Sequence, residues 1–292
     1  AKQAIYNLFQ ILLNEGDEVI IPAPFWLSYP QIIKLAGGKP IILETSPENG
    51  FKIDINKLKS KITSRTKFII INTPNNPTGK VLDKDELNEI LDVVRKYDQL
   101  NVMSDEIYEM ILRKGIEHIS LFSLAKDLRD RIYTINGFAK GWAMTGWRIG
   151  YLVGRKDVIK ASSALQSQST SNVCSFVQKG ALEALNMKQA YFDEINSIYD
   201  ERRETLYKGL KKINGIFVNP PLGAFYAFPQ LPNKTISSVE FCKKVIEDFG
   251  LVVVPGKAFG NDQCIRISCA TSKETIKDGC KKLEKAIAFY YE

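Results

Sequence analysis

Residues 67–79 of the chain read KFIIINTPNNPTG. The run from Phe68 to Ile71 is apolar at every position, which is typical of a short strand buried within a sheet. The residues that follow are rich in asparagine and proline, which favour turns over regular structure. The stretch therefore predicts a buried strand that delivers a polar turn at its carboxyl end.

The same pattern repeats along the first half of the chain. Short apolar runs alternate with helix-length amphipathic segments such as Lys84 to Tyr97, for which Asp83 is a reasonable N-cap. This alternation predicts an α/β fold with a mostly parallel sheet between two layers of helices. The predicted strands are Glu18 to Ile21, Pro40 to Leu43, Lys67 to Ile71, Leu100 to Met103, Arg131 to Ile135 and Ile149 to Val153.

The second half of the chain has a different organisation. Helices are predicted at Asp157 to Gln168, at Ser175 to Asn186 and, as a long stretch, at about 189–212. Beyond Gly215 the pattern predicts short strands at Phe225 to Phe228, Leu251 to Val254 and Cys264 to Ile267, with helices at Ser237 to Phe249 and Lys273 to Tyr290. We expect a large three-layer domain at residues 1–200 and a smaller C-terminal α+β domain at 201–292, joined by the long helix.

Composition narrows the function classes. With 292 residues, 45% of them hydrophobic and 25% charged, the chain can bury a large core. Its net charge of +7 is scattered without an arginine-rich tract, so we expect no nucleic-acid partner. The five cysteines form no CxxC pair and are interpreted as buried thiols of a cytoplasmic protein. No apolar run approaches the ~18 residues of a membrane span, so no membrane association is expected.

His118 is the only histidine. A histidine-rich metal centre is therefore excluded, no metal site is expected, and any serine or cysteine triad would depend on this one residue. The surrounding residues 114–118 predict an exposed turn.

Polar side chains follow three of the predicted strands. Asn76, Asp105 and Lys140 each come shortly after a strand, and ligands of open parallel sheets bind outside the carboxyl ends of the strands. Each residue also has an ordinary interpretation. Asn76 could serve the turn, Asp105 could cap a helix equally well, and Lys140 could be a solvated loop lysine. Their convergence on one edge favours a binding site.

These groups suit a flat heteroaromatic aldehyde. Lys140 could form a Schiff base if its pKa is lowered by burial or by a cationic neighbour. Asp105 could pair with a protonated pyridine nitrogen. Asn76 and Tyr108 could contact a ring hydroxyl. Trp26 could stack on the ring, although an ordinary core tryptophan explains it better when it is taken alone.

Two further features suit anions. A helix that starts at Ala1 and Lys2 offers free amide groups, to which Arg148 could add a bidentate contact. Arg266 lies in an apolar strand and could bind a carboxylate if it faces inward. The alternation alone slightly favours an outward, solvated Arg266.

Taken together, the motifs resemble those of class I aminotransferases of the fold-type-I pyridoxal-phosphate group, and most of all the bacterial-type aspartate aminotransferase branch. The likeness runs in order along essentially the whole chain. The matching segments are residues 1–4, 16–19, 74–79, 104–108, Lys140, 144–151, 223–226, 254–256 and 266–268.

The resemblance implies a role for each of these residues. Lys140 would hold pyridoxal 5'-phosphate as a Schiff base and then move a proton to and from the substrate Cα, while Asp105 would keep the pyridine nitrogen protonated. The other implied contacts are Tyr108 and Asn76 on the ring oxygen, Trp26 on the ring face and beside the substrate, Arg148 with the amides of Ala1 and Lys2 on the phosphate, and Asn76 with Arg266 on the substrate carboxylate.

The implied activity is transfer of an amino group from an amino acid, aspartate in this branch, to a 2-oxo acid such as 2-oxoglutarate. A homodimer is also implied, with residues 168–171 near the neighbour's cofactor. The alternatives are an aromatic or prephenate aminotransferase, a pyridoxal-phosphate β-lyase on the same scaffold, and a pyridoxal-phosphate-binding regulatory domain.

The chain departs from the family pattern at two places. Gly137 stands where some relatives have a phosphate-binding serine. The family also has a further region ahead of the position of Ala1, so an N-terminal region is expected to be missing.

Overall fold

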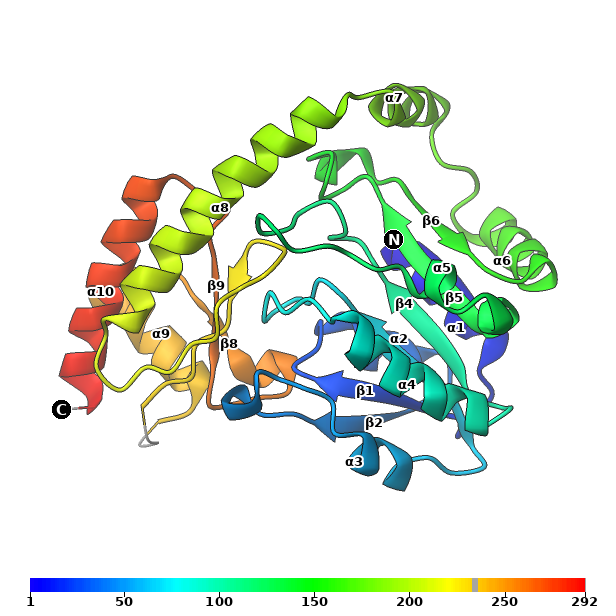
Figure 1. Ribbon diagram of the computed structural model, residues 1–292, viewed down its shortest axis with the longest axis horizontal. Coiled ribbons are helices and arrows are strands. Elements are labelled where there is room, and N and C mark those ends of the chain that lie inside the picture. Colours follow the sequence, from blue (N-terminus) through cyan, green and yellow to red (C-terminus); the bar gives the residue numbers. More distant parts are fainter. Residues whose placement is uncertain (233–235, 292) are drawn as a thin grey trace.

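The computed structural model describes residues 1–232 and 236–291. A six-stranded sheet forms the centre of the larger part, and a long helix leads from it to a smaller unit at the C-terminal end (Figure 1).

The large sheet has the strand order β2-β1-β3-β4-β5-β6. The first five strands pair in parallel, and β6 pairs antiparallel with β5. The mostly parallel sheet predicted from the sequence is therefore confirmed, with strand ends shifted by one or two residues. The strands are β1 (Glu18–Ala23), β2 (Lys39–Glu44), β3 (Thr66–Asn72), β4 (Asn101–Asp105), β5 (Ile132–Gly137) and β6 (Gly150–Val153).

Alternate residues of strands β1 to β5 build two separate cores. In β3, Phe68 and Ile70 face a cluster shared with α1, α2 and α6, whereas Ile69 and Ile71 face a cluster shared with α3, α4 and α5. This explains the unbroken apolar run, because both faces of the strand are covered. The covering helices are α1 (Lys2–Leu12), α2 (Ser28–Leu35), α3 (Ile55–Ser60), α4 (Lys84–Lys96), α5 (Leu121–Leu124) and α6 (Lys156–Ser169).

Helix α4 begins where the sequence predicted. The Asp83 side chain accepts a 2.8 Å hydrogen bond from the Glu86 amide, and the Glu86 carboxylate accepts one from the Asp83 amide at 3.2 Å. This reciprocal pair is a capping box, which satisfies two amides that the first turn leaves free. Short 3₁₀ helices complete the larger part, namely η1 (Pro47–Asn49), η2 (Lys126–Arg131) and η3 (Thr145–Trp147).

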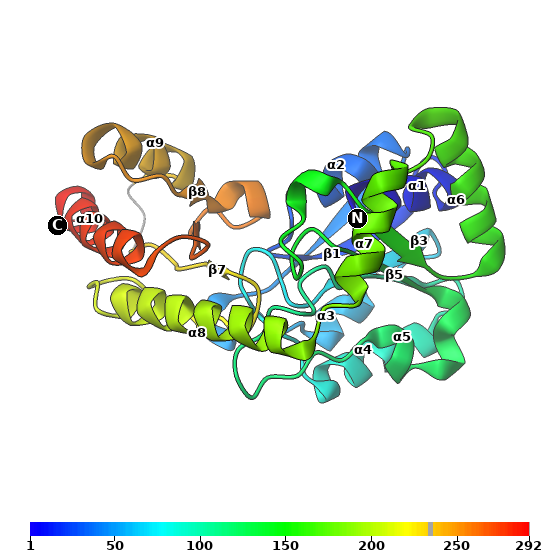
Figure 2. The same cartoon turned by 90° about the horizontal axis from the view of Figure 1, so that it is seen from above.

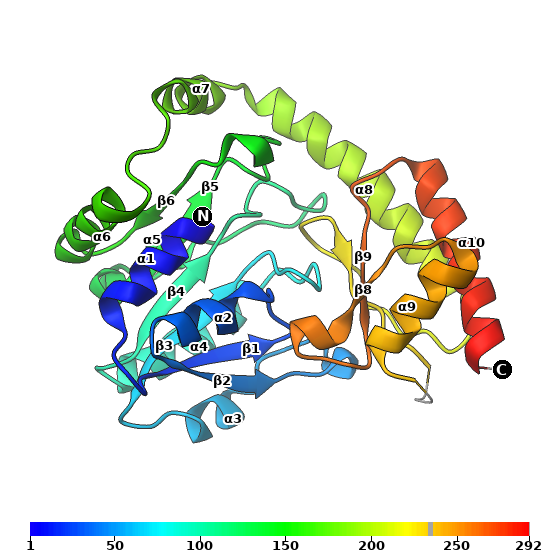
Figure 3. The ribbon, with the colours of Figure 1, turned by 180° about the vertical axis from the view of Figure 1, so that it is seen from behind.

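The smaller unit stands beside the carboxyl ends of the large sheet (Figures 2 and 3). Three helices and a three-stranded sheet of order β7-β9-β8 share one core that includes Leu206, Phe241 and Leu283. Its elements, with the preceding helix α7, are α7 (Ser175–Leu185), α8 (Gln189–Lys211), β7 (Tyr226–Ala227), α9 (Ser238–Phe249), β8 (Val254–Pro255), η4 (Gly256–Phe259), β9 (Ile265–Ser268) and α10 (Lys273–Tyr291). Because α8 belongs to this core, it is part of the smaller unit as well as the connection to it.

The cysteines are not all buried. Cys242, Cys264 and Cys269 are buried, and burial raises the pKa of the Cys264 thiol to about 12. Cys280 is half-buried, and Cys174 is exposed, so the prediction of buried thiols is wrong for Cys174. In the described ranges, every helix is too short or too polar to cross a membrane.

Candidate active site

A pocket of about 1000 Å³ opens between the carboxyl edge of the large sheet and the smaller unit. The carboxyl ends of β3 and β4 contribute to it, as do the loop after β5, the first turn of α1 and strand β9. Its volume is at the upper end of the range of small-molecule sites, so it has room for a cofactor together with a substrate. The lining includes all the residues singled out from the sequence, namely Ala1, Lys2, Trp26, Asn76, Asp105, Tyr108, Lys140, Arg148 and Arg266.

Asp105 is the last residue of β4 and is only 4% exposed. Its carboxylate accepts a 2.6 Å hydrogen bond from the Tyr29 hydroxyl and a 3.2 Å bond from the Ile107 amide. Burial raises the pKa of Asp105, and these two hydrogen bonds act in the opposite direction. A turn follows Asp105 rather than a helix, so the helix-cap interpretation is wrong.

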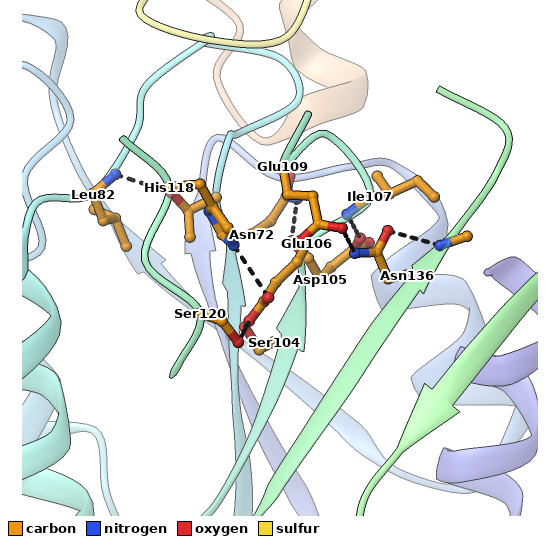
Figure 4. A network of polar contacts seen from close by, with 12 residues as sticks. Asn72, Leu82, Ser104, Asp105, Glu106, Ile107, Glu109, His118, Ser120 and Asn136 are labelled. Carbon is orange, nitrogen blue, oxygen red and sulfur yellow. Dashed lines mark hydrogen bonds and ion pairs between the residues drawn. The ribbon is translucent and has the colours of Figure 1, made fainter. Parts of the chain in front are cut away.

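The neighbouring carboxylate, Glu106, is buried among polar side chains (Figure 4). One of its oxygens accepts hydrogen bonds from the hydroxyls of Ser104 at 2.7 Å and Ser120 at 3.2 Å. The other lies 3.1 Å from Nε2 of His118. Each carboxylate oxygen thus has a partner, as a buried charge requires.

The position of His118 corrects the sequence-based interpretation. Its side chain is only 8% exposed, because the loop after β4 folds back and places the imidazole against Glu106. The exposed turn predicted for this segment is therefore wrong at His118, whereas Glu117 beside it is exposed.

A second set of contacts joins the turn after β4 to the end of β5 (Figure 4). The Asn136 amide donates a 2.7 Å hydrogen bond to Glu109, and the Asn136 side-chain oxygen accepts one from the Gly137 amide at 2.7 Å. Burial raises the pKa of Glu109. These bonds fix the strand end three residues before Lys140.

Lys140 is half-buried and lines the pocket. Its ammonium lies 5.7 Å from the ring centre of Tyr108. Burial lowers the pKa of Lys140, and the positive charges of Arg266 and Arg148 lower it further. Among the described residues, we find no hydrogen-bond acceptor for this amine. Lys140 is thus neither an open-surface lysine nor a member of an ion pair.

Arg266 faces the pocket from β9. Its guanidinium lies 4.6 Å from the ring centre of Tyr226 and 4.8 Å from that of Phe259, and it donates a 3.0 Å hydrogen bond to the side-chain oxygen of Asn76. The outward, solvated position favoured by the strand pattern is wrong. Within the described ranges, Arg266 has no carboxylate partner, which leaves its charge available to an anionic ligand.

The first turn of α1 reaches the pocket through a glycine contact. A Cβ atom at Gly150 would collide with the backbone nitrogen of Ala1, so only glycine allows this approach. Ala1 is the N-cap and supplies no side-chain cap, which leaves the amides of the first turn without a side-chain acceptor. Arg148 lines the same pocket and donates a 2.6 Å hydrogen bond to the Thr145 carbonyl.

The close contact between β5 and β6 also explains why position 137 is a glycine. A Cβ atom at this position would lie 2.6 Å from the Gly150 Cα, closer than the packed strands permit. The same two glycines therefore bring β5, β6 and α1 together, and a serine at position 137 has no room in this arrangement.

The aromatic residues of the pocket are held by other aromatic residues. Trp26 lies edge-to-face with Tyr29 at 5.3 Å, packs against the core and lines the pocket, so both interpretations of Trp26 apply. The hydroxyls of Tyr108 and Tyr226 are 3.0 Å apart in a buried pair. Tyr29 and Tyr226 were missed from the sequence. One signal could have indicated Tyr29. It lies three residues after Trp26, a spacing that puts both side chains on one face of a helical turn.

Part of the segment 168–171 lines the pocket. Thr170 and Ser171 line the pocket of this chain, and the Gln166 amide holds them by donating to the Thr170 hydroxyl at 2.7 Å and to the Ser171 carbonyl at 2.9 Å. The predicted contact with a neighbouring subunit stays a prediction.

Known proteins resemble the chain along nearly its whole length. A family model described as aminotransferase class I and II matches residues 1–283. A Rickettsia bellii protein named probable aspartate/prephenate aminotransferase is 44% identical, over 98% of this chain and 74% of that protein. A structure of aspartate aminotransferase from Thermus thermophilus with maleate has a TM-score of 0.92 and 39% identity, over 98% of this chain and 74% of that one. An aromatic aminotransferase structure from Pyrococcus horikoshii has a TM-score of 0.93 and 35% identity, over 98% and 77%.

Proposed function

The chain belongs to the class I and II aminotransferase family, and we propose that its pocket binds pyridoxal 5'-phosphate and transfers an amino group from aspartate to 2-oxoglutarate. The observation that carries the proposal is the meeting of three groups in one pocket, namely the amine of Lys140, the buried carboxylate of Asp105 and the guanidinium of Arg266.

The residues of the pocket fit this cofactor. Lys140 offers an amine with a lowered pKa and no acceptor among the described residues, which suits reaction with an aldehyde. Asp105 offers a negative charge in a dry environment, which suits a protonated pyridine nitrogen. The first turn of α1 lies against Gly150 at the pocket, where its backbone amides and Arg148 can bind a phosphate.

When bound, pyridoxal phosphate supplies an electron-withdrawing pyridinium that accepts negative charge as a proton leaves the substrate Cα. Asp105 stabilises that charge state, because its carboxylate would lie against the ring nitrogen. Asn76 and Tyr108 would orient the ring through its oxygen, with Trp26 against the ring face.

Lys140 has two tasks in this proposal. Its neutral amine would hold the cofactor covalently, and when Nζ is free it would carry a proton to and from the substrate Cα. A base needs a pKa near the working pH, and burial together with Arg266 and Arg148 moves the pKa of Lys140 in that direction.

Two anionic groups, the cofactor phosphate and the substrate α-carboxylate, would be held by arginine side chains. Arg148, with the amides of Ala1 and Lys2, would hold the phosphate. Arg266 would bind the substrate α-carboxylate together with Asn76, and the Tyr226 and Phe259 rings keep its guanidinium in place.

Aspartate as the amino donor is supported by the names of the relatives. The Rickettsia bellii protein is named for aspartate and prephenate, and the Thermus thermophilus structure contains the dicarboxylate maleate. The likeness to an aromatic aminotransferase favours aromatic substrates as the second candidate. We also propose a cytoplasmic homodimer, in which residues 168–171 approach the neighbouring subunit's cofactor.

Titration with amino donors tests the proposal. The protein is mixed with pyridoxal phosphate and 2-oxoglutarate, and glutamate formation is measured with aspartate, tyrosine and alanine as donors. The proposal predicts the highest kcat/KM with aspartate. A preference for tyrosine supports the second candidate, and release of pyruvate and ammonia without glutamate contradicts aminotransfer.

A further inference from the structure

A buried tyrosine supports the pocket carboxylate from behind. Tyr29 lies in α2, is 1% exposed, and donates to Oδ2 of Asp105 at 2.6 Å. The other oxygen, Oδ1, accepts from the Ile107 amide at 3.2 Å. In the described part of the chain, Tyr29 is the only side chain that donates to this carboxylate.

We propose that Tyr29 is a positioning residue for pyridoxal phosphate, whose hydroxyl holds the Asp105 carboxylate in the orientation and the ionised form that a protonated pyridine nitrogen needs. This inference rests on the proposed function, because the pyridine nitrogen belongs to the cofactor.

Geometry supports the orienting role. The two oxygens of Asp105 are held by donors from two different elements, α2 and the turn after β4, and two such contacts fix the plane of a carboxylate. Tyr29 cannot move aside, because its ring packs edge-to-face on Trp26 within the core between the sheet and α1. Each carboxylate oxygen has two acceptor positions, so these bonds leave capacity for the ring nitrogen.

Charge supports the ionising role. Burial raises the pKa of Asp105 and the neighbouring charge of Glu106 raises it further, whereas the Tyr29 hydrogen bond and the Ile107 amide lower it. The proton of the pair stays on the tyrosine, because burial and the charge of Asp105 hold the pKa of Tyr29 well above its ordinary value. Tyr29 is therefore the donor, and its loss removes the largest influence that favours the carboxylate.

The first test needs no cofactor. In protein with ¹³C-labelled aspartate carboxyls, NMR titration follows Asp105, whose resonance is assigned by its loss in Asp105→Asn. Tyr29→Phe should raise the pKa of Asp105, because the charged form loses a hydrogen bond. Replacement of Tyr29 by 3-fluorotyrosine, a more acidic donor of nearly the same shape, should lower it. Tyr133→Phe is the matched control, since Tyr133 is equally buried in the same core but does not touch Asp105.

The second test measures binding of two ligands, pyridoxal phosphate and its analogue with a carbon in place of the ring nitrogen. Tyr29→Phe should weaken the first by roughly tenfold and leave the second unchanged, because only the ring nitrogen meets Asp105. In an Asp105→Asn background the same change should have no further effect.

The outcomes separate this inference from the function on which it rests. If the unaltered protein does not bind pyridoxal phosphate, the proposed function fails, while the NMR titration still reports on the pair. If pyridoxal phosphate binds, but Tyr29→Phe and the fluorinated residue leave the Asp105 titration unchanged, or if both ligands weaken equally, the inference is overturned. Thermal unfolding shows whether each variant is folded, and the fluorinated residue decides the case if Tyr29→Phe is not.

Discussion

The acidic side of the pocket, Asp105 and Glu106, differs from its basic side, Lys140, Arg148 and Arg266. Each acidic carboxylate is buried, and each of its oxygens accepts a hydrogen bond from the protein. The three basic groups are held by backbone carbonyls, an amide oxygen or aromatic rings, and within the described ranges none of them forms an ion pair.

The two sides should therefore contribute differently to the stability of the fold and to ligand binding. The carboxylates of the acidic side already have hydrogen-bond partners in the folded chain, so they contribute to stability as well as to binding. The basic side is incomplete, because three positive charges near one pocket repel each other until an anion joins them. Changes on the basic side should therefore affect function with little loss of stability, and changes on the acidic side should affect stability.

Lys140→Ala should have the largest effect. It removes both the covalent anchor and the base, so we expect aminotransfer to fall by about 10⁴-fold or more. The free energy of unfolding in urea should not decrease, because the change removes a partly desolvated charge. Lys156→Ala, on the exposed start of α6, is the control and should retain activity. Loss of stability in Lys140→Ala would show that the basic side, like the acidic side, stabilises the fold.

Arg266→Gln should rank second. The loss of a charged contact to the substrate carboxylate should lower kcat/KM by roughly 10- to 100-fold. Stability should stay nearly constant, since the guanidinium has no ion-pair partner among the described residues. Arg129→Gln, far from the pocket, controls for loss of positive charge. Unchanged kcat/KM for all amino donors would show that Arg266 does not bind the substrate carboxylate.

Glu106→Ala tests the acidic side. It leaves Ser104, Ser120 and His118 without their shared acceptor in a buried place, and we expect a loss of about 3 kcal/mol in the free energy of unfolding. Urea denaturation measures it. Glu117→Ala on the same loop is the exposed control and should change stability by less than about 0.5 kcal/mol. Equal values for the two variants would show that the Glu106 network does not stabilise the fold.

The pH dependence of cofactor uptake gives the smallest expected effect. Only the neutral amine of Lys140 attacks an aldehyde, so the rate of uptake should rise with pH through a midpoint below 10.5, the ordinary pKa of lysine. Because this pKa is depressed in the folded state, its linked contribution to stability is present above pH 10.5 and is lost as pH falls through the midpoint. Arg266→Gln should move the midpoint upward by less than the whole depression, since burial is the larger cause. A midpoint at or above 10.5 would contradict the lowered pKa.

Much of the fold could be predicted because its causes are local. Runs such as Phe68 to Ile71 indicate strands covered on both faces, and Asp83 marks the start of α4. Asp105 and Lys140 could be placed in one site because the carboxyl ends of parallel strands meet at one edge.

The remaining features depend on contacts that are distant in sequence. The His118 side chain is buried because its loop returns to Glu106, which its polar neighbours do not indicate. Arg266 lies in a four-residue strand between the buried Ile265 and the partly buried Ile267, too short for alternation to give its direction. Tyr29 reaches Asp105 across 76 positions of sequence, a pairing that no spacing rule predicts.

Covalent labelling shows directly whether Lys140 is the residue that binds pyridoxal phosphate. The protein is incubated with pyridoxal phosphate, reduced with borohydride, digested and analysed by mass spectrometry, with Lys140→Ala in parallel. We expect a phosphopyridoxyl group on the peptide that contains Lys140 and none at any site in the variant. Labelling of another lysine in both proteins, with Lys140 unmodified, would contradict it.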